Sequence, residues 1–285
     1  MSDFCQEQHC QKPYLTIRQG HINSGSMTSE LGDPLLDMAS AGDVAQMRAL
    51  LLARQEPPPE ETIQNALTTA AKHSHLDIVK LLLSRYLSVP LNEEIVRVAV
   101  NTGSTPIFQA LLAYDPSIIN MQFDHRGTPL IVACMGRQDI SYLNLLLEAG
   151  ADPNQDPDAA AFPLALIAAL YTDPGVIDLL LSYGAKIEHS GALAAAARRG
   201  NEIMLQRLLD RGARIEDDAP DIAVGSLPLH IAVKAGHLDV VKMLLENGAD
   251  ATVEDAGGAT VFDLIKRMGD DGKDVSQITE ILRED

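Results

Sequence analysis

The feature that most constrains the fold of this chain is a sequence motif that occurs four times, in which a run of leucines precedes a glycine–alanine pair. The spacings between its four glycines are 34, 28 and 36 residues, and the glycines are Gly150, Gly184, Gly212 and Gly248. A fixed period of about 33 residues is typical of a solenoid, in which each repeat is one supersecondary unit that stacks on its neighbours. We therefore expect a repeat array.

A second sequence motif predicts the helices within each repeat. A proline–leucine pair precedes the glycine by 20 or 21 residues in three of the repeats. Proline suits the first position of a helix, because its fixed φ is helical and the N–H it lacks would have no partner there. Glycine suits the residue after a helix, because it adopts the left-handed conformation without strain. We predict that Pro129, Pro163 and Pro228 each begin a first helix and that the later glycine ends a second one.

Two stretches, Gly127–Asn154 and Leu227–Asp250, resemble ankyrin repeats along almost their whole length. The resemblance implies an all-α ankyrin-repeat solenoid of about eight stacked helix-turn-helix units with capping end repeats. The array is expected over residues 33–285, with units at about 33–59, 60–90, 91–120, 121–154, 155–188, 189–215, 216–251 and 252–285. Residues 1–30 show no sustained apolar period and are expected to be disordered. Whether Met1 or Met27 is the true start stays open.

Composition limits the partners that such a chain can bind. Apolar residues make up 46% of the chain but aromatics only 4%, which suits a core of Leu, Ala, Ile and Val, and the net charge is -18. An acidic surface repels nucleic-acid phosphates and anionic lipids, so we expect neither nucleic acid nor membrane as a partner. A simpler interpretation is that the charge keeps a leucine-rich array in solution.

The cysteines and the hydropathy pattern predict a location. Three cysteines are too few for a disulfide framework, which favours a reducing compartment, the cytoplasm or also the nucleus. No run of 18 apolar residues is present, and the N-terminus does not have the layout of a signal peptide. We expect a soluble protein, and a monomer.

The resemblance also implies where a partner binds. Partners of ankyrin repeats usually contact the turn tips and the exposed ends of the first helices, on the concave side of the array. Carried over to this sequence, these positions give the candidate partner-binding residues His125, Arg126, Met135, Leu170, Tyr171, Arg198, Arg199 and Lys234. An apolar middle with a basic rim is typical of an interface. We hypothesise that this strip binds an acidic or mixed-charge segment of a protein or peptide, and the alternative is a row of ordinary solvated helix ends.

No motif supports catalysis, and we predict no enzyme, no cofactor and no metal site. The group His73, His75 and Asp77 has metal-ligand chemistry, but it coincides with the start of a second helix, where an acidic residue is favoured. Cys134 falls within an apolar helical pattern and is expected to be buried. One alternative is an array adapted to a small molecule or an enzymatic step, with a pocket at the irregular units 155–215. Another is a pathogen-type effector, and the choice among adaptor, inhibitor and regulatory subunit also stays open.

Overall fold

The computed structural model describes residues 33–124, 127–155, 162–216 and 227–284, and the predicted disordered segment 1–30 lies outside them. Throughout the described residues the regular secondary structure is helical, which confirms the predicted all-α repeat solenoid. Within these described residues the helices α1 to α16 follow one another as eight consecutive pairs. Their bounds are α1 (Pro34–Ala41), α2 (Val44–Ala53), α3 (Glu60–Lys72), α4 (Leu76–Arg85), α5 (Glu93–Asn101), α6 (Thr105–Tyr114), α7 (Pro129–Met135), α8 (Ile140–Glu148), α9 (Pro163–Leu170), α10 (Gly175–Ser182), α11 (Ala192–Arg199), α12 (Glu202–Asp210), α13 (Pro228–Ala235), α14 (Leu238–Glu246), α15 (Val261–Asp270) and α16 (Ser276–Glu284).

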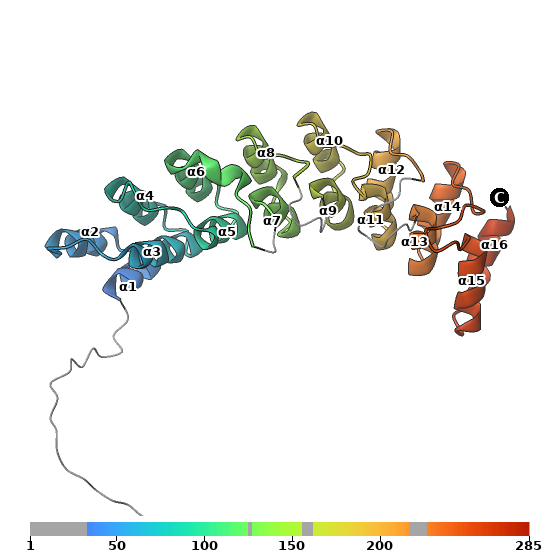
Figure 1. The fold of residues 1–285 in the computed structure, drawn as a ribbon, viewed down its shortest axis with the longest axis horizontal. Helices are drawn as coiled ribbons and strands as arrows, with labels where there is room; N and C mark the ends of the chain where they lie inside the picture. The colour runs from blue at the N-terminus through green and yellow to red at the C-terminus, as the bar shows by residue number, and fades with distance from the viewer. Residues whose placement is uncertain (1–32, 125–126, 156–161, 217–226, 285) are drawn as a thin grey trace, which may run out of the picture. The chain divides into compact units, whose positions relative to one another are not determined.

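The first helices of successive pairs pack side by side in one row, and the second helices form a second row above them (Figure 1). Between the rows runs one hydrophobic cluster that extends from Leu35 to Ile278. A 3-10 helix, η1 (Pro116–Asn120), interrupts the regularity by inserting between α6 and α7, and the repeat pattern did not predict it. No helix of the described residues combines the length and the apolar character needed to cross a membrane.

The helix ends form where the sequence predicts them. Pro129, Pro163 and Pro228 lie at the starts of α7, α9 and α13. The glycines that follow the second helices, Gly150, Gly184, Gly212 and Gly248, all have a φ between 87° and 95°. Both predictions are confirmed, because each depends only on local backbone geometry.

Side-chain hydrogen bonds at the turn tips tie neighbouring pairs together. The Asn120 amide donates to the carbonyl oxygen of Gly150 at 2.9 Å, and its own oxygen accepts from the N–H of Asp152. One unit later, Asn154 makes the same two bonds, to the Gly184 carbonyl and from the Lys186 N–H. Each asparagine thus fixes the spacing between its own tip and the next one.

The start of α13 lacks a cap that the start of α7 possesses. The Thr128 hydroxyl accepts a hydrogen bond from the backbone N–H of Ile131, whereas Leu227 stands at the corresponding position before α13 and has no such bond. We expect Leu227→Thr to raise the free energy of unfolding by about 1 kcal/mol, because a threonine cap satisfies an N–H that is otherwise left without a partner. Urea denaturation checks this. The reciprocal control, Thr128→Leu, should lose a similar amount, and a destabilised Leu227→Thr variant would contradict the prediction.

Candidate functional site

The C-terminal ends of four successive first helices lie next to one another. The helices α7, α9, α11 and α13 pack pairwise along their row, so their last residues follow one another along one side of the array (Figure 1). We call these residues the helix-end strip, and they are Met135, Leu170, Tyr171, Arg198, Arg199 and Lys234. The structure therefore brings together six of the eight candidate residues, while His125 and Arg126 lie outside the described residues.

Hydrogen bonds across each junction hold the strip in place. The Tyr171 hydroxyl donates to the Gln138 carbonyl at 2.9 Å, and the Asn201 amide donates to the Tyr171 carbonyl at 2.7 Å. The imidazole Nε2 of His237 donates to the Arg198 carbonyl at 3.1 Å. The Tyr171 and Arg198 carbonyls lie at helix ends, where they have no partner within the helix, and the Gln138 carbonyl lies in the turn between α7 and α8. The three donors therefore satisfy these carbonyls and fix each unit relative to the next. The side chains of the strip thus project from a rigid base.

The strip presents unpaired positive charge to the solvent. Arg198, Arg199 and Lys234 are exposed, and none of them has an ion-pair partner in the described residues. All three lie in the last turn of a helix, where the helix dipole favours a cation. Met135, at the end of α7, adds an apolar side chain that is 57% exposed. The strip therefore offers cations at the ends of α11 and α13 and an exposed apolar side chain at the end of α7.

Tyr171 contributes more to the array than the sequence suggested. Its ring packs against the core, and its hydroxyl donates to the backbone of the preceding unit. Burial raises the pKa of this phenol far above its ordinary value, so the hydroxyl keeps its proton and remains a donor. Tyr171 is therefore a link between units, and the side chain it offers to a partner is half-buried.

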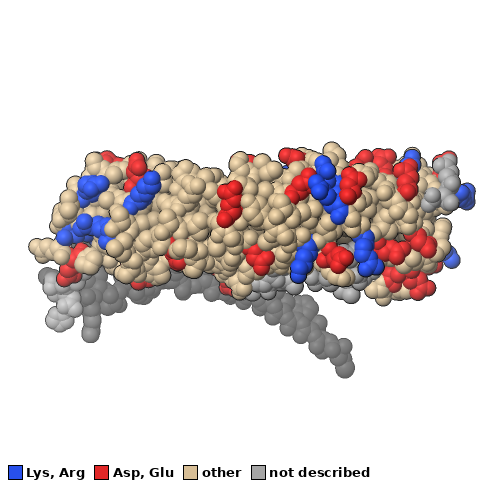
Figure 2. Space-filling model, turned by 90° about the horizontal axis from the view of Figure 1, so that it is seen from above, with Lys and Arg blue, Asp and Glu red and all other residues tan. Residues whose placement is uncertain are grey.

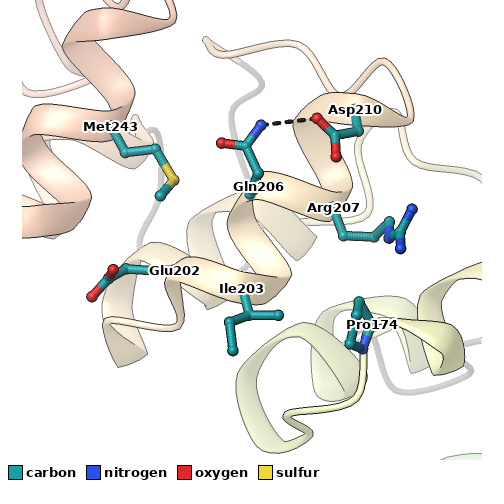
Figure 3. A pocket seen from close by; sticks show the side chains of 7 residues that line it. All are labelled: Pro174, Glu202, Ile203, Gln206, Arg207, Asp210 and Met243. Carbon is teal, nitrogen blue, oxygen red and sulfur yellow. Dashed lines mark hydrogen bonds between the residues drawn. The ribbon is translucent and has the colours of Figure 1, made fainter.

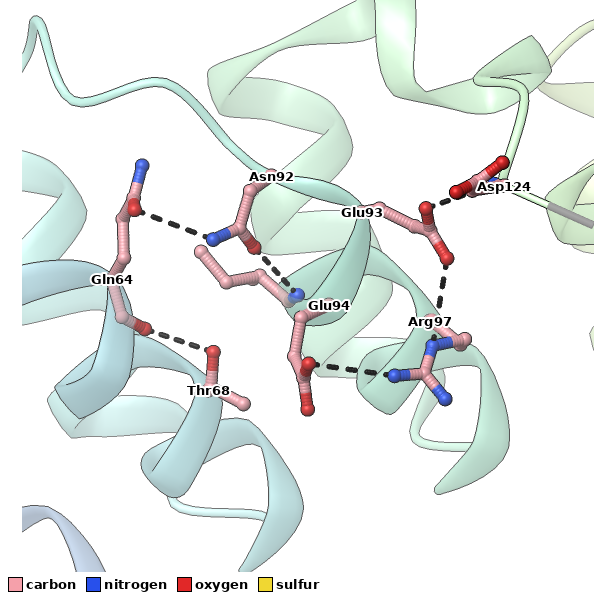
Figure 4. A network of polar contacts seen from close by, with 8 residues as sticks. Gln64, Thr68, Asn92, Glu93, Glu94, Arg97 and Asp124 are labelled. Atoms are coloured by element: carbon pink, nitrogen blue, oxygen red, sulfur yellow. Dashed lines mark hydrogen bonds and ion pairs between the residues drawn. The ribbon is translucent and has the colours of Figure 1, made fainter. Parts of the chain in front are cut away.

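Towards the N-terminal end, the polar side chains of the first helices bond to one another (Figure 4). The Asn92 amide donates to the Gln64 side chain at 3.3 Å, and Arg97 forms ion pairs with Glu94 at 3.4 Å and Glu93 at 3.9 Å. Glu93 also accepts a hydrogen bond from the backbone N–H of Asp124 at 2.9 Å. These contacts join three units, and they engage Gln64 on α3 and Glu93, Glu94 and Arg97 on α5.

The residues with catalytic or metal-binding chemistry have structural roles. Cys134 is fully buried, and burial raises the pKa of its thiol well above the ordinary value, which disfavours the reactive thiolate. His75 donates to the Ser40 carbonyl at 3.0 Å, and buried His230 donates to the Ala259 carbonyl at 2.9 Å. Among the described residues, no three His, Cys, Asp or Glu side chains are grouped so that they could hold a metal ion.

A hollow of about 400 Å³ lies on the second-helix row, in and beside the irregular units 155–215 (Figure 3). Its apolar surface comes from Pro174, Ile203 and Met243, and its carboxylates come from Glu202 and Asp210. Both carboxylates are exposed, and Asp210 accepts a hydrogen bond from the Gln206 side chain at 2.8 Å. The lining contains no hydroxyl, thiol or imidazole that could act as a nucleophile beside a base.

Comparisons with known proteins point to one family. An ankyrin-repeat model matches residues 126–157, and a model of three ankyrin repeats matches residues 164–255. The ankyrin repeat and KH domain-containing protein mask-1 of Caenorhabditis elegans is 28% identical over 261 residues, which is 85% of this chain and 9% of that protein. The mouse 2-5A-dependent ribonuclease is 38% identical over 76 residues, 27% of this chain and 10% of the ribonuclease.

A solved structure agrees with these matches. The ankyrin repeat domain of Bcl-3 superposes with a TM-score of 0.50 at 25% identity, covering 64% of this chain and 87% of that domain. The chain spans about a tenth of the length of the two curated relatives described above. What those larger proteins do as a whole therefore does not transfer directly to this chain.

Proposed function

The chain is an ankyrin-repeat protein, and from this premise we propose that it binds a partner protein or peptide on the concave side of its array, without catalysis. Ankyrin repeats are in general protein-interaction modules, so an adaptor, scaffold or regulatory role fits the family. The helix-end strip lies in the units proposed at 121–154, 155–188, 189–215 and 216–251. We propose this strip, together with the tip residues His125 and Arg126, as the binding surface.

The observation that carries the proposal is the unpaired charge of Arg198, Arg199 and Lys234. In a chain of net charge -18, these three cations lie exposed at the ends of the adjacent helices α11 and α13, and none has an ion-pair partner among the described residues. A partner carboxylate would replace the solvation that these cations now have. A segment that also reaches α7, two helix pairs before α11, would remove the apolar Met135 from water. The proposed partner segment is therefore acidic or of mixed charge.

The same electrostatics bears on the other partner classes. A net charge of -18 disfavours nucleic acid and anionic lipid surfaces, so we propose a protein partner, met in the cytoplasm or also in the nucleus. We propose that the chain acts as a monomer. The small-molecule alternative rests on the hollow beside α12, whose lining has no nucleophile, so we place it second.

Reversing the charge of the strip tests the proposal. The full chain and the variant Arg198→Glu/Arg199→Glu/Lys234→Glu are used as baits, and captured proteins are quantified by mass spectrometry. Partners of the wild-type chain should be depleted at least tenfold by the variant, which corresponds to about 1.4 kcal/mol or more of lost binding energy.

The matched control is Lys80→Glu/Lys242→Glu/Lys266→Glu, which changes the net charge equally at exposed positions away from the strip. It should retain the same partners. Undiminished capture by the strip variant, or equal losses from both variants, would show that the strip is not the binding surface.

A further inference from the structure

The start of α12 reverses the order of apolar and polar residues found at the starts of two other second helices, α4 and α14, which we call its sister helices. Helices α4 and α14 begin Leu-Asp after their N-cap histidine, while α12 begins Glu-Ile after Asn201. In the sister helices the leucine packs against the core and the aspartate is exposed. In α12 the charged Glu202 and the aliphatic Ile203 are both exposed. The exchange moves an aliphatic side chain from the core side to the solvent side.

Ile203 is 57% exposed and does not belong to the hydrophobic core. It lies in the hollow of about 400 Å³, where Pro174 flanks it at the start of α10 and Met243 of α14 lies on the other side of α12 (Figure 3). Three consecutive helix pairs thus supply apolar side chains to one exposed groove. Such an exposed apolar surface favours a contact that removes it from water.

The edge of this groove is negatively charged. Glu202 and Asp210 are exposed, and neither has an ion-pair partner among the described residues. The nearby cations are already engaged, since Arg211 pairs with Asp178 at 2.9 Å and Arg207 lies 3.9 Å from the same carboxylate. Figure 2 looks onto the row of second helices and shows acidic side chains, interspersed with basic ones, over its C-terminal part. The groove therefore attracts a cation and not an anion.

We propose that the groove on α12 is a second docking site, which takes a basic, amphipathic helical segment of another protein. Its aliphatic side chain lies among Pro174, Ile203 and Met243, and its lysine or arginine pairs with Asp210, while Glu202 favours a further cation at the near end. Ile203 and Asp210 are seven residues apart on one helix, about 10 Å along its axis. A partner helix that runs along α12 would therefore place its aliphatic and basic residues about seven positions apart. The charge preference is opposite to that of the helix-end strip, so one array could hold two different partners.

The test uses the full chain and two synthetic helical peptides of alanine and leucine, one with lysine and one with glutamate seven residues after the leucine. Binding is followed by NMR through the methyl groups of isoleucine. The lysine peptide should shift the Ile203 methyl signals, and the glutamate peptide should bind at least tenfold more weakly. Shifts confined to isoleucines away from α12, or equal binding of the two peptides, would overturn the proposal.

Two variants and one control separate this site from general attraction to an acidic protein. Ile203→Asp restores the residue type found in the sister helices, so this variant should fold normally. Its affinity for the lysine peptide should be at least tenfold lower than that of the wild-type chain. Glu202→Lys/Asp210→Lys should lower the affinity for the lysine peptide by a similar factor. The control Asp270→Lys/Asp271→Lys makes the same charge change in the last unit and should lower this affinity less than threefold. If the control lowers the affinity as much as Glu202→Lys/Asp210→Lys does, the proposal is contradicted.

Sedimentation without peptide distinguishes the other possible occupant, a second copy of this chain. A monomeric wild-type chain is the expected result. If the wild-type chain is a dimer that Ile203→Asp converts to a monomer, the groove is a self-association surface and the proposed partner is wrong.

Discussion

Replacement of Phe108 by alanine is expected to lower the free energy of unfolding by about 3–5 kcal/mol. The Phe108 ring on α6 is fully buried and meets the ring of Tyr142 on α8 edge to face, with the centroids 6.0 Å apart. The hydrophobic cluster that contains this pair is built mainly from aliphatic side chains, since the chain has only five phenylalanines and no tryptophan. Because such neighbours cannot fill the space of a whole ring, the variant keeps a cavity and also loses the aromatic contact.

The chain offers a matched control in Phe262, whose side chain is 49% exposed at the start of α15. Phe262→Ala removes the same atoms from a partly solvated position and should cost about 1 kcal/mol or less. Urea denaturation followed by circular dichroism compares the two variants. Similar midpoints would show that the α6–α8 contact does not stabilise the array as its burial implies.

The repeat architecture could be predicted from the sequence because its signals are local. A proline that begins α9 and a glycine that follows α10 each act through their own backbone dihedrals, so they carry the same meaning in any context. The helix η1 was not predicted, because it occurs once and interrupts the repeat. Its N-cap is Asp115, whose side chain accepts a hydrogen bond from the backbone N–H of Ser117. This cap is not part of the repeat pattern, so a prediction based on the repeat does not find it.

The sequence predicted the site only where the position of a residue along its helix determines whether the side chain is exposed. The ends of the first helices were expected to be exposed, and Arg198, Arg199 and Lys234 are exposed. The role of Tyr171 was not foreseen, because its hydroxyl bonds to Gln138, 33 residues earlier, and that contact depends on how closely two units stack. The groove at Ile203 was also missed. The sequence contains Glu-Ile in α12 where α4 and α14 have Leu-Asp. This difference can be recognised only when the three helices are aligned by their N-cap residues.

Replacement of Ala196 by leucine is expected to cost about 1–3 kcal/mol and to disturb the helix-end strip from within. Ala196 is fully buried in α11, whose residues from Ala192 to Ala197 are all buried. Helix α11 packs against α9 on one side and α13 on the other, and alanine side chains let these helices approach closely. Three added carbon atoms have no space there, so the neighbouring helices must separate.

The control is Ala113→Leu, which makes the same change at an exposed position of α6 and should alter stability by no more than about 0.5 kcal/mol. Urea denaturation measures both variants. If Ala196→Leu is as stable as its control, the close packing of α11 is not required. If it is destabilised as expected, the separation of α9, α11 and α13 also moves Leu170, Arg199 and Lys234 apart. A partner bound by the strip should then bind Ala196→Leu more weakly, although no residue of the strip has been changed.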